Sequence, residues 1–202
     1  MAVIFYGKTC LCRLAVGMIV FALLATGCSD KAPKMYQVGV ICGLDHFLPL
    51  VDGFKSRMTE LGYLQGETIV YDIQTTNADP VADRQIAEMF VKKGVDLILT
   101  TPTQASITTQ AVIQGTDIPM VFANAAIEGN RLVKKSIAEP GGNTTGVRYP
   151  GPEKVCKTLE LLLEFVPDVK RVWVGYEKNY PTVDPHIGCF AAAGILQGRF
   201  VG

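Results

Sequence analysis

Short apolar runs alternate with amphipathic helical patterns from Tyr36 to Tyr176, and this alternation limits the chain to one class of fold. Most of the strand-like runs precede a segment with apolar residues at three- and four-residue steps, which is typical of a helix packed on a core. This order predicts an α/β fold with a parallel, doubly wound sheet that helices cover on both faces. The predicted strands are residues 36–42, 68–73, 95–100, 118–123, 143–147 and 171–176.

The predicted helices carry start and stop signals. Asp79 and Pro80 supply an N-cap and a first-turn proline for a helix that runs to Lys93 and closes at Gly94. We attribute the acids Asp79 and Asp83 to the favourable electrostatics of a helix N-terminus. The other predicted helices are residues 46–62, a segment that opens at 101–104, and a helix from 151 to 166.

The N-terminal residues are typical of an export signal rather than of a folded domain. Lys8 and Arg13 are the only charges before Asp30, and an apolar run from Leu14 to Gly27 follows them. This run is shorter than the roughly 20 residues that span a bilayer, although a single transmembrane anchor is the alternative. Residues 24–28, Leu-Ala-Thr-Gly-Cys, resemble a bacterial lipobox, which implies lipid attachment at Cys28. An ordinary cleaved signal with an incidental cysteine is the other interpretation.

Composition excludes several classes of function. Nineteen basic and nineteen acidic residues give no net charge, so nucleic-acid binding has no electrostatic support. Beyond the signal and Cys28, the cysteines Cys42, Cys156 and Cys189 are scattered without metal-ligand spacing, so we expect no metal site and interpret Cys42 and Cys156 as small buried residues. Nucleotide-binding glycine motifs and hydrolase motifs are missing from the sequence, so we expect no cofactor and no catalysis.

Candidate ligand residues lie in the loops that follow the predicted strands, because ligands of open parallel sheets bind at the carboxyl ends of the strands. After the first strand come Asp45 and His46, which are otherwise a helix N-cap and a surface histidine. After the third strand, residues 101–104 (Thr-Pro-Thr-Gln) offer hydroxyls and free helix N–H groups, although a capping box alone also explains Thr101 and Gln104. Asn124 follows the fourth strand, where a simple turn residue is the alternative.

Several segments, in order, resemble the ABC-transporter substrate-binding family whose better-known members bind aromatic amino acids such as tryptophan. The most specific are residues 117–123 (Asp-Ile-Pro-Met-Val-Phe-Ala) and 139–147 (Glu-Pro-Gly-Gly-Asn-Thr-Thr-Gly-Val). The resemblance implies a type I periplasmic-binding-protein fold, in which two α/β lobes close on a small ligand, and of which this chain holds the first lobe and only the start of the second. Carried over by position, it implies ligand contacts from Asp45, His46, Thr101, Thr103, Gln104, Asn124 and Tyr180. Family members often have Asp-Pro soon after the fourth strand, where this chain has residues 125–128 (Ala-Ala-Ile-Glu).

The C-terminal residues break the pattern. After Pro185 the chain lacks the charges of the preceding helices and shows no amphipathic period, so we hypothesise a frameshift near residues 184–186. The expected organisation is a lipoprotein signal (1–28), a tether (29–35), lobe 1 (36–150), a crossover helix with the start of lobe 2 (151–185) and an aberrant tail (186–202).

The sequence therefore predicts a lipid-anchored, extracytoplasmic solute-binding protein, periplasmic if the cell has two membranes, that binds a small molecule such as an amino acid and serves an ABC permease. Two alternatives remain open at this point. One is a ligand-sensing lobe of a receptor or regulator, and the other is an exported enzyme.

Overall fold

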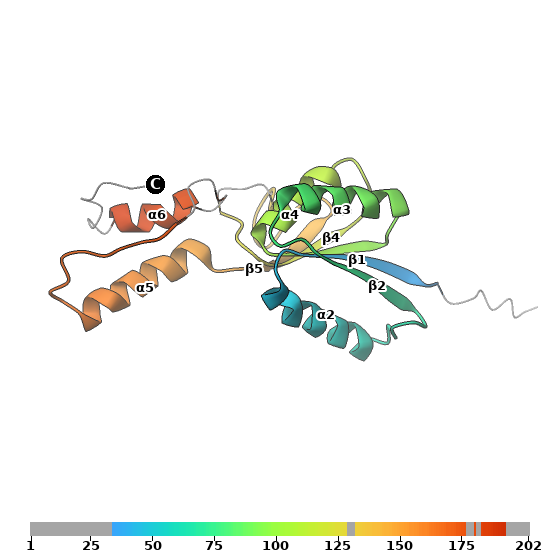
Figure 1. Cartoon of the computed structure of the whole chain (residues 1–202), viewed down its shortest axis with the longest axis horizontal. Helices are drawn as coiled ribbons and strands as arrows, with labels where there is room; N and C mark the ends of the chain where they lie inside the picture. Colours follow the sequence, from blue (N-terminus) through green and yellow to red (C-terminus); the bar gives the residue numbers. More distant parts are fainter. Residues whose placement is uncertain (1–33, 129–131, 177–179, 181–182, 193–202) are drawn as a thin grey trace, which may run out of the picture. The chain divides into compact units, whose positions relative to one another are not determined.

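A computed structural model describes residues 34–128, 132–176, 180 and 183–192. Its centre is a five-stranded sheet in the order β2-β1-β3-β4-β5 (Figure 1). The strands are β1 (Tyr36–Cys42), β2 (Ile69–Thr75), β3 (Leu97–Thr101), β4 (Met120–Ala125) and β5 (Thr144–Arg148). All neighbouring strands pair in parallel, which confirms the predicted α/β class. The predicted signal and Cys28 lie outside the described residues.

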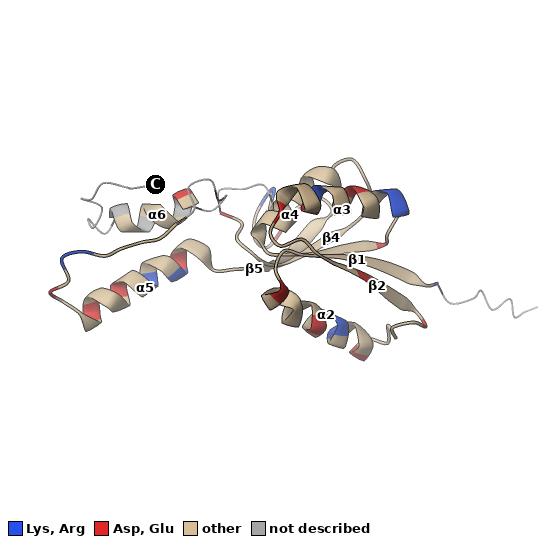
Figure 2. Cartoon of the chain, viewed as in Figure 1, with Lys and Arg blue, Asp and Glu red and all other residues tan. Residues whose placement is uncertain are grey.

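Helices follow the first, second, third and fifth strands as the sequence predicts, whereas the helix Val183–Ala192 was not predicted. The helices are the short 3-10 helix η1 (Asp45–Phe47), α2 (Leu48–Glu60), α3 (Pro80–Lys93), α4 (Thr103–Val112), α5 (Gly151–Phe165) and α6 (Val183–Ala192). The signals at α3 are confirmed, since Asp79 accepts a hydrogen bond from the Val81 N–H and Gly94 closes the helix in the left-handed conformation. Charges of both signs occur along α2, α3 and α5 (Figure 2). Within the described residues, none of the helices is long and apolar enough to cross a membrane.

Both faces of the sheet are buried, with α2 on one side and α3 and α4 on the other (Figure 1). On the α2 face, Val51 packs with Val38, Val40 and Leu99. On the other face, the fully buried Phe90 packs with a cluster that includes Ile41, Ile98, Met120 and Phe122. This double coverage explains why the strands read as nearly continuous apolar runs.

Two predictions about local structure are wrong. Residues 171–176 do not form a strand, and Trp173 is 92% exposed. A strand requires a hydrogen-bonded neighbour, and the described residues place none beside this segment. The capping box at 101–104 is also absent. Thr101 is the last residue of β3, paired with Cys42. The N-cap of α4 is Pro102, which makes no side-chain hydrogen bond, and the helix begins at Thr103.

The cysteines differ from one another in their surroundings. Cys42 is fully buried, as predicted, and its Sγ donates to the Leu44 carbonyl. Burial raises the pKa of the Cys42 thiol. Cys156 is half-buried and disulfide-bonded, so the interpretation of it as a small buried residue is wrong. Spacing along the chain carries no signal for such a pairing.

Candidate functional site

The sheet changes its direction of winding between β1 and β3. From β1 the chain passes to β2 on one side, and then returns to place β3, β4 and β5 on the other. Loops leaving adjacent strands at such a switch point part to opposite faces, and the crevice between them is the usual ligand position in open α/β sheets. We call the loops at this edge the strand-end site, defined as residues 43–46, 76–79, 101–104 and 124–128.

The loops after β1 and β3 approach each other closely. The Gly43 N–H donates to the Thr101 carbonyl at 2.7 Å. A Cβ at Gly43 would lie 2.7 Å from Pro102 Cδ, so only glycine fits this position without a shift of the neighbouring loop. The two backbones at the switch point are therefore held in one fixed arrangement.

Backbone strain gathers at this edge. Among the described residues, non-glycine residues with positive φ are Asn77 (53°), Ala78 (59°) and Asn124 (55°), and all three belong to the strand-end site. The left-handed conformation costs an alanine about 1 kcal/mol, and here the Ala78 N–H is held by the Gly43 carbonyl at 2.6 Å. Strained backbone conformations that the surroundings hold in place are concentrated at binding sites in general.

The β3–α4 residues predicted from sequence lie at this edge but have different roles. Thr103 is buried, and its Oγ1 accepts a hydrogen bond from the Ala126 N–H at 3.0 Å, which ties α4 to the loop after β4. Gln104 is half-buried and donates to Thr108 Oγ1 at 3.1 Å. The Thr101 hydroxyl is fully buried and has no hydrogen-bond partner within the described part of the chain.

The remaining predicted residues differ in exposure. Asp45 and His46 are exposed in η1, whose N-cap is Leu44 rather than Asp45, and the His46 ring contacts the Phe47 ring with centroids 4.0 Å apart. Asn124 is half-buried at a β-bulge where the β4–β5 register shifts. Tyr180 lies apart from these loops in sequence, between α5 and α6. Its side chain is half-buried and its carbonyl accepts from the Val183 N–H.

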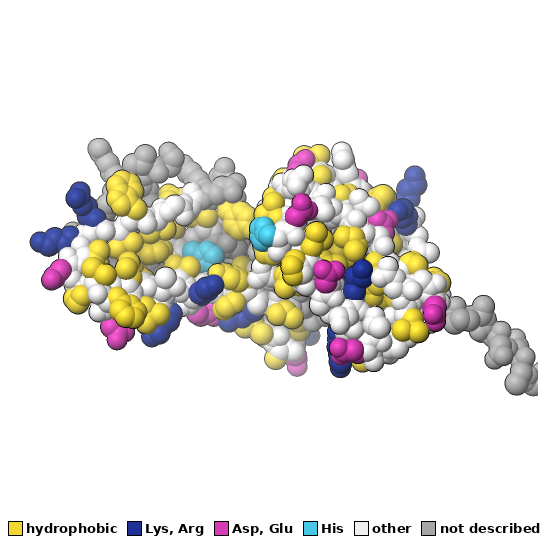
Figure 3. Space-filling model, turned by 60° about the horizontal axis from the view of Figure 1, so that its bottom comes forward, with side chains coloured by type: hydrophobic (Ala, Val, Ile, Leu, Met, Phe, Trp, Pro, Cys, Tyr) yellow, Lys and Arg dark blue, Asp and Glu magenta, His cyan; other side chains and the backbone are white. Residues whose placement is uncertain are grey.

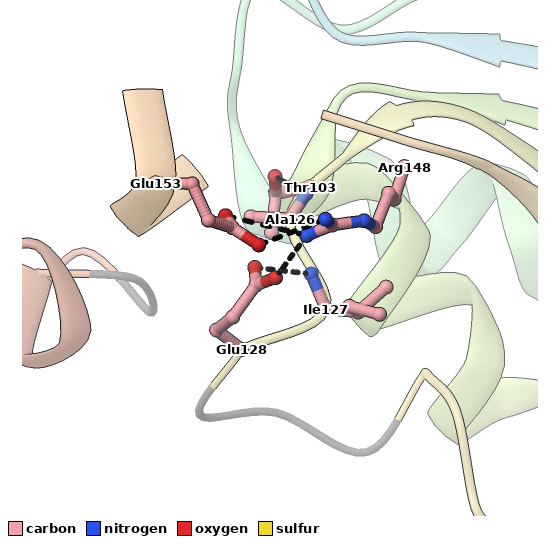
Figure 4. A network of polar contacts seen from close by, with 6 residues as sticks. All are labelled: Thr103, Ala126, Ile127, Glu128, Arg148 and Glu153. Atoms are coloured by element: carbon pink, nitrogen blue, oxygen red, sulfur yellow. Dashed lines mark hydrogen bonds and ion pairs between the residues drawn. The ribbon is translucent and has the colours of Figure 1, made fainter. Parts of the chain in front are cut away.

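A polar network beside the loop after β4 was not predicted from the sequence (Figure 4). Arg148, at the end of β5, contacts Glu128 in that loop through Nη1 (2.6 Å to Oε1) and Glu153 in the first turn of α5 through Nη2 (2.8 Å to Oε1). Hydrogen bonding to Glu153 raises the pKa of Arg148, and the same bond lowers the pKa of Glu153. Glu128 lies 20 residues from Arg148 in the sequence, so no local motif marks the network.

Asp83 lies in the first turn of α3, as the sequence interpretation places it, but it is fully buried, which the sequence interpretation did not predict. Burial raises the pKa of the Asp83 carboxyl, and the neighbouring Thr76 hydroxyl partly offsets the rise. The spacing of Asp83, Ala87 and Phe90 on one helical stripe is the signal that could have revealed its burial.

A cavity of about 390 Å³ lies outside the strand-end site, between α5, the segment 172–175 and Phe190 of α6. Apolar side chains such as Leu159, Leu162 and Trp173 line it, and Lys154 contributes a charge. Figure 3 shows apolar side chains gathered on the surface of this part of the chain, where Phe165 is 81% exposed. No group of three or more His, Cys, Asp or Glu able to hold a metal ion occurs among the described residues.

The parallel sheet, its strand order and its switch-point loops define a lobe of the type I periplasmic-binding-protein fold. The model of the ABC transporter substrate binding protein family matches residues 37–192, so the chain belongs to that family. Comparison with curated proteins finds no match.

Solved structures agree on the fold. An ABC domain from Streptococcus pneumoniae in complex with L-Trp is 23% identical with a TM-score of 0.69, over 79% of this chain and 53% of that one. A conserved domain protein from Vibrio cholerae is 26% identical with a TM-score of 0.67, over 80% and 55%. A leucine-binding protein from Thermotoga maritima is 19% identical with a TM-score of 0.58, over 79% and 46%. The chain thus spans about half the length of these proteins.

Proposed function

We propose that the chain is the ligand-binding part of an extracytoplasmic solute-binding lipoprotein that delivers a small molecule to an ABC permease. The family assignment supports the general role. The predicted export signal and the lipobox ending at Cys28 support a location outside the cytoplasm, where acyl chains hold the protein at the membrane surface.

The ligand we propose is an amino acid, bound with the strand-end site as one wall of the cleft. One of the similar structures holds L-Trp and another is named a leucine-binding protein. The site offers complementary groups for a zwitterion: the exposed Asp45 carboxylate for an ammonium, and the half-buried Asn124 amide for a carboxylate.

The observation that carries this proposal is the gathering of positive φ angles in the strand-end site. Asn77, Ala78 and Asn124 come from the ends of different strands, yet they lie at one edge. Packing of the core does not require strain at these positions, since Asn77 and Ala78 are exposed. Binding surfaces that present backbone groups in one orientation are a general setting for such conformations, which supports the proposal.

Isothermal titration calorimetry of the full chain in mild detergent, with L-tryptophan, L-leucine and the other proteinogenic amino acids, tests the proposal. Asn124→Gly removes the side chain while keeping the left-handed backbone accessible, so it should weaken binding about tenfold without loss of stability. Gln114→Ala, at an exposed position outside the site, is the matched control and should leave binding unchanged. Binding of equal strength in both variants, or no heat with any amino acid, would contradict the proposal.

A further inference from the structure

Arg148 occupies a position that joins three segments of the chain (Figure 4). Its guanidinium donates to Glu128 Oε1 at 2.6 Å, to Glu153 Oε1 at 2.8 Å and to Glu153 Oε2 at 3.4 Å. Glu128 belongs to the loop after β4, Arg148 ends β5, and Glu153 lies in the first turn of α5. A planar guanidinium can serve two carboxylates at once in this way, whereas a lysine ammonium has no such fork.

This network differs from the surface ion pairs of the same chain. The side chains of Arg148 and Glu128 are 28% and 24% exposed. In the pair Lys157–Glu160 on α5, the corresponding values are 68% and 64%. Solvent screens the exposed pair strongly, so it contributes little, whereas the Arg148–Glu128 contact is partly shielded.

Glu128 links Arg148 to the backbone of the strand-end site. Its Oε2 accepts the Ile127 N–H at 3.1 Å, and the adjacent Ala126 N–H donates to Thr103 Oγ1 at 3.0 Å. Two successive N–H groups after the β4 bulge are thus held by side chains rather than by a strand ladder. The conformation of this loop therefore depends on where the Glu128 carboxylate is held.

The start of α5 fits closely around the same carboxylate. Gly151 is buried, and a Cβ placed there would lie 3.4 Å from Glu128 Oε2 and 2.7 Å from His186 Nε2. An added Cβ would make an ordinary contact with Glu128 but would clash with the His186 ring. Movement of α5 at this point would be felt by Glu128 directly.

We propose that Arg148 is a positioning residue that holds the loop after β4 in its ligand-facing conformation and fastens that loop to the first turn of α5. The effect on ligand affinity rests on the proposed function. The positioning itself does not, because it concerns amide groups that can be observed without any ligand.

Amide hydrogen exchange of the full chain, resolved at single residues by NMR and recorded without ligand, tests this proposal. In Arg148→Met, the exchange rate of the Ile127 amide should rise at least about tenfold, as expected when a charge-assisted hydrogen bond is lost. Arg148→Lys restores a positive charge beside Glu128 and should return part of this protection. The matched control Lys157→Met removes an exposed ion pair of α5 and should leave Ile127 unchanged.

Unchanged Ile127 exchange in Arg148→Met, with core amides such as that of Val40 still protected, would overturn the proposal. If Arg148→Met unfolds the chain, the variants Arg148→Lys and Glu153→Gln test the proposal instead. Both should raise exchange at Ile127 and in the first turn of α5, by less than tenfold, while Val40 stays protected. Faster exchange confined to α5 in both of these variants would equally overturn it. A chain that binds no amino acid yet shows the predicted exchange would refute the proposed function alone.

Discussion

Substitution of Gly39 by alanine tests the packing of β1 against α3. A Cβ at this position would lie 2.5 Å from Phe90 Cδ2 and 2.7 Å from both Phe90 Cε2 and Phe90 Cγ. Phe90 is completely buried, so the ring has no free space into which to move. Overpacking of this kind costs about 1–3 kcal/mol, and the reduced entropy of the unfolded chain returns about 0.4–1 kcal/mol. We therefore expect Gly39→Ala to lower the free energy of unfolding by about 1–2 kcal/mol.

Urea denaturation of the full chain measures this change, with the m-value checked for constancy. Phe90→Leu should be destabilising alone, yet in combination with Gly39→Ala it removes the outer ring atoms and leaves space into which the shorter side chain can shift. The double variant should then lose at least about 1 kcal/mol less than the sum of the single losses. The control is Gly53→Ala on α2, where an added Cβ meets nothing within 4 Å and should stabilise by up to about 1 kcal/mol. A neutral Gly39→Ala, or strict additivity with Phe90→Leu, would refute the reasoning.

Three further predictions concern single residues. The raised pKa of Asp83 means that the folded chain binds more protons than the unfolded chain, so its contribution to stability falls as pH rises from about 4 through the folded-state pKa. Asp83→Asn does not titrate, so the wild-type minus variant difference in urea midpoints should fall between pH 4 and pH 8. A difference that stays constant with pH would contradict the burial effect. Asp79→Ala removes the cap that accepts the Val81 N–H at 2.9 Å and should cost about 1 kcal/mol in the same assay, whereas no loss would mean that the cap is dispensable. Cys28→Ser should abolish incorporation of labelled palmitate and release the exported protein from membranes, and continued labelling would exclude Cys28 as the lipidated residue.

Sequence reasoning succeeded where the determinants are local. The helix α3 was predicted from Asp79, Pro80 and Gly94, because capping and chain reversal depend on neighbouring residues alone. The parallel sheet followed from the alternation of strands and helices, and its carboxyl edge could then be assigned by a general rule. That rule predicts from the sequence alone that Asp45, Thr101 and Asn124 lie at one edge of the sheet.

The errors arose where structure depends on distant partners. Residues 171–176 have the pattern of a strand, but a strand exists only beside another, and the described residues provide none there. The Thr103 hydroxyl is used by the Ala126 N–H, which is 23 positions away in sequence. Arg148 lies 20 residues from Glu128, so only the folded chain reveals their contact.

Mapping of ligand contacts on the strand-end site tests the central claim most directly. Amide chemical shifts of the ¹⁵N-labelled full chain would be followed during titration with L-tryptophan and with L-leucine. The account predicts that saturable shifts gather at residues 43–46, 76–79, 101–104 and 124–128. Half-saturation should need about tenfold more ligand in Asn124→Gly and should be unchanged in Gln114→Ala. Shifts gathered instead around the cavity at Leu159 and Trp173, or spread evenly over the chain, would contradict it.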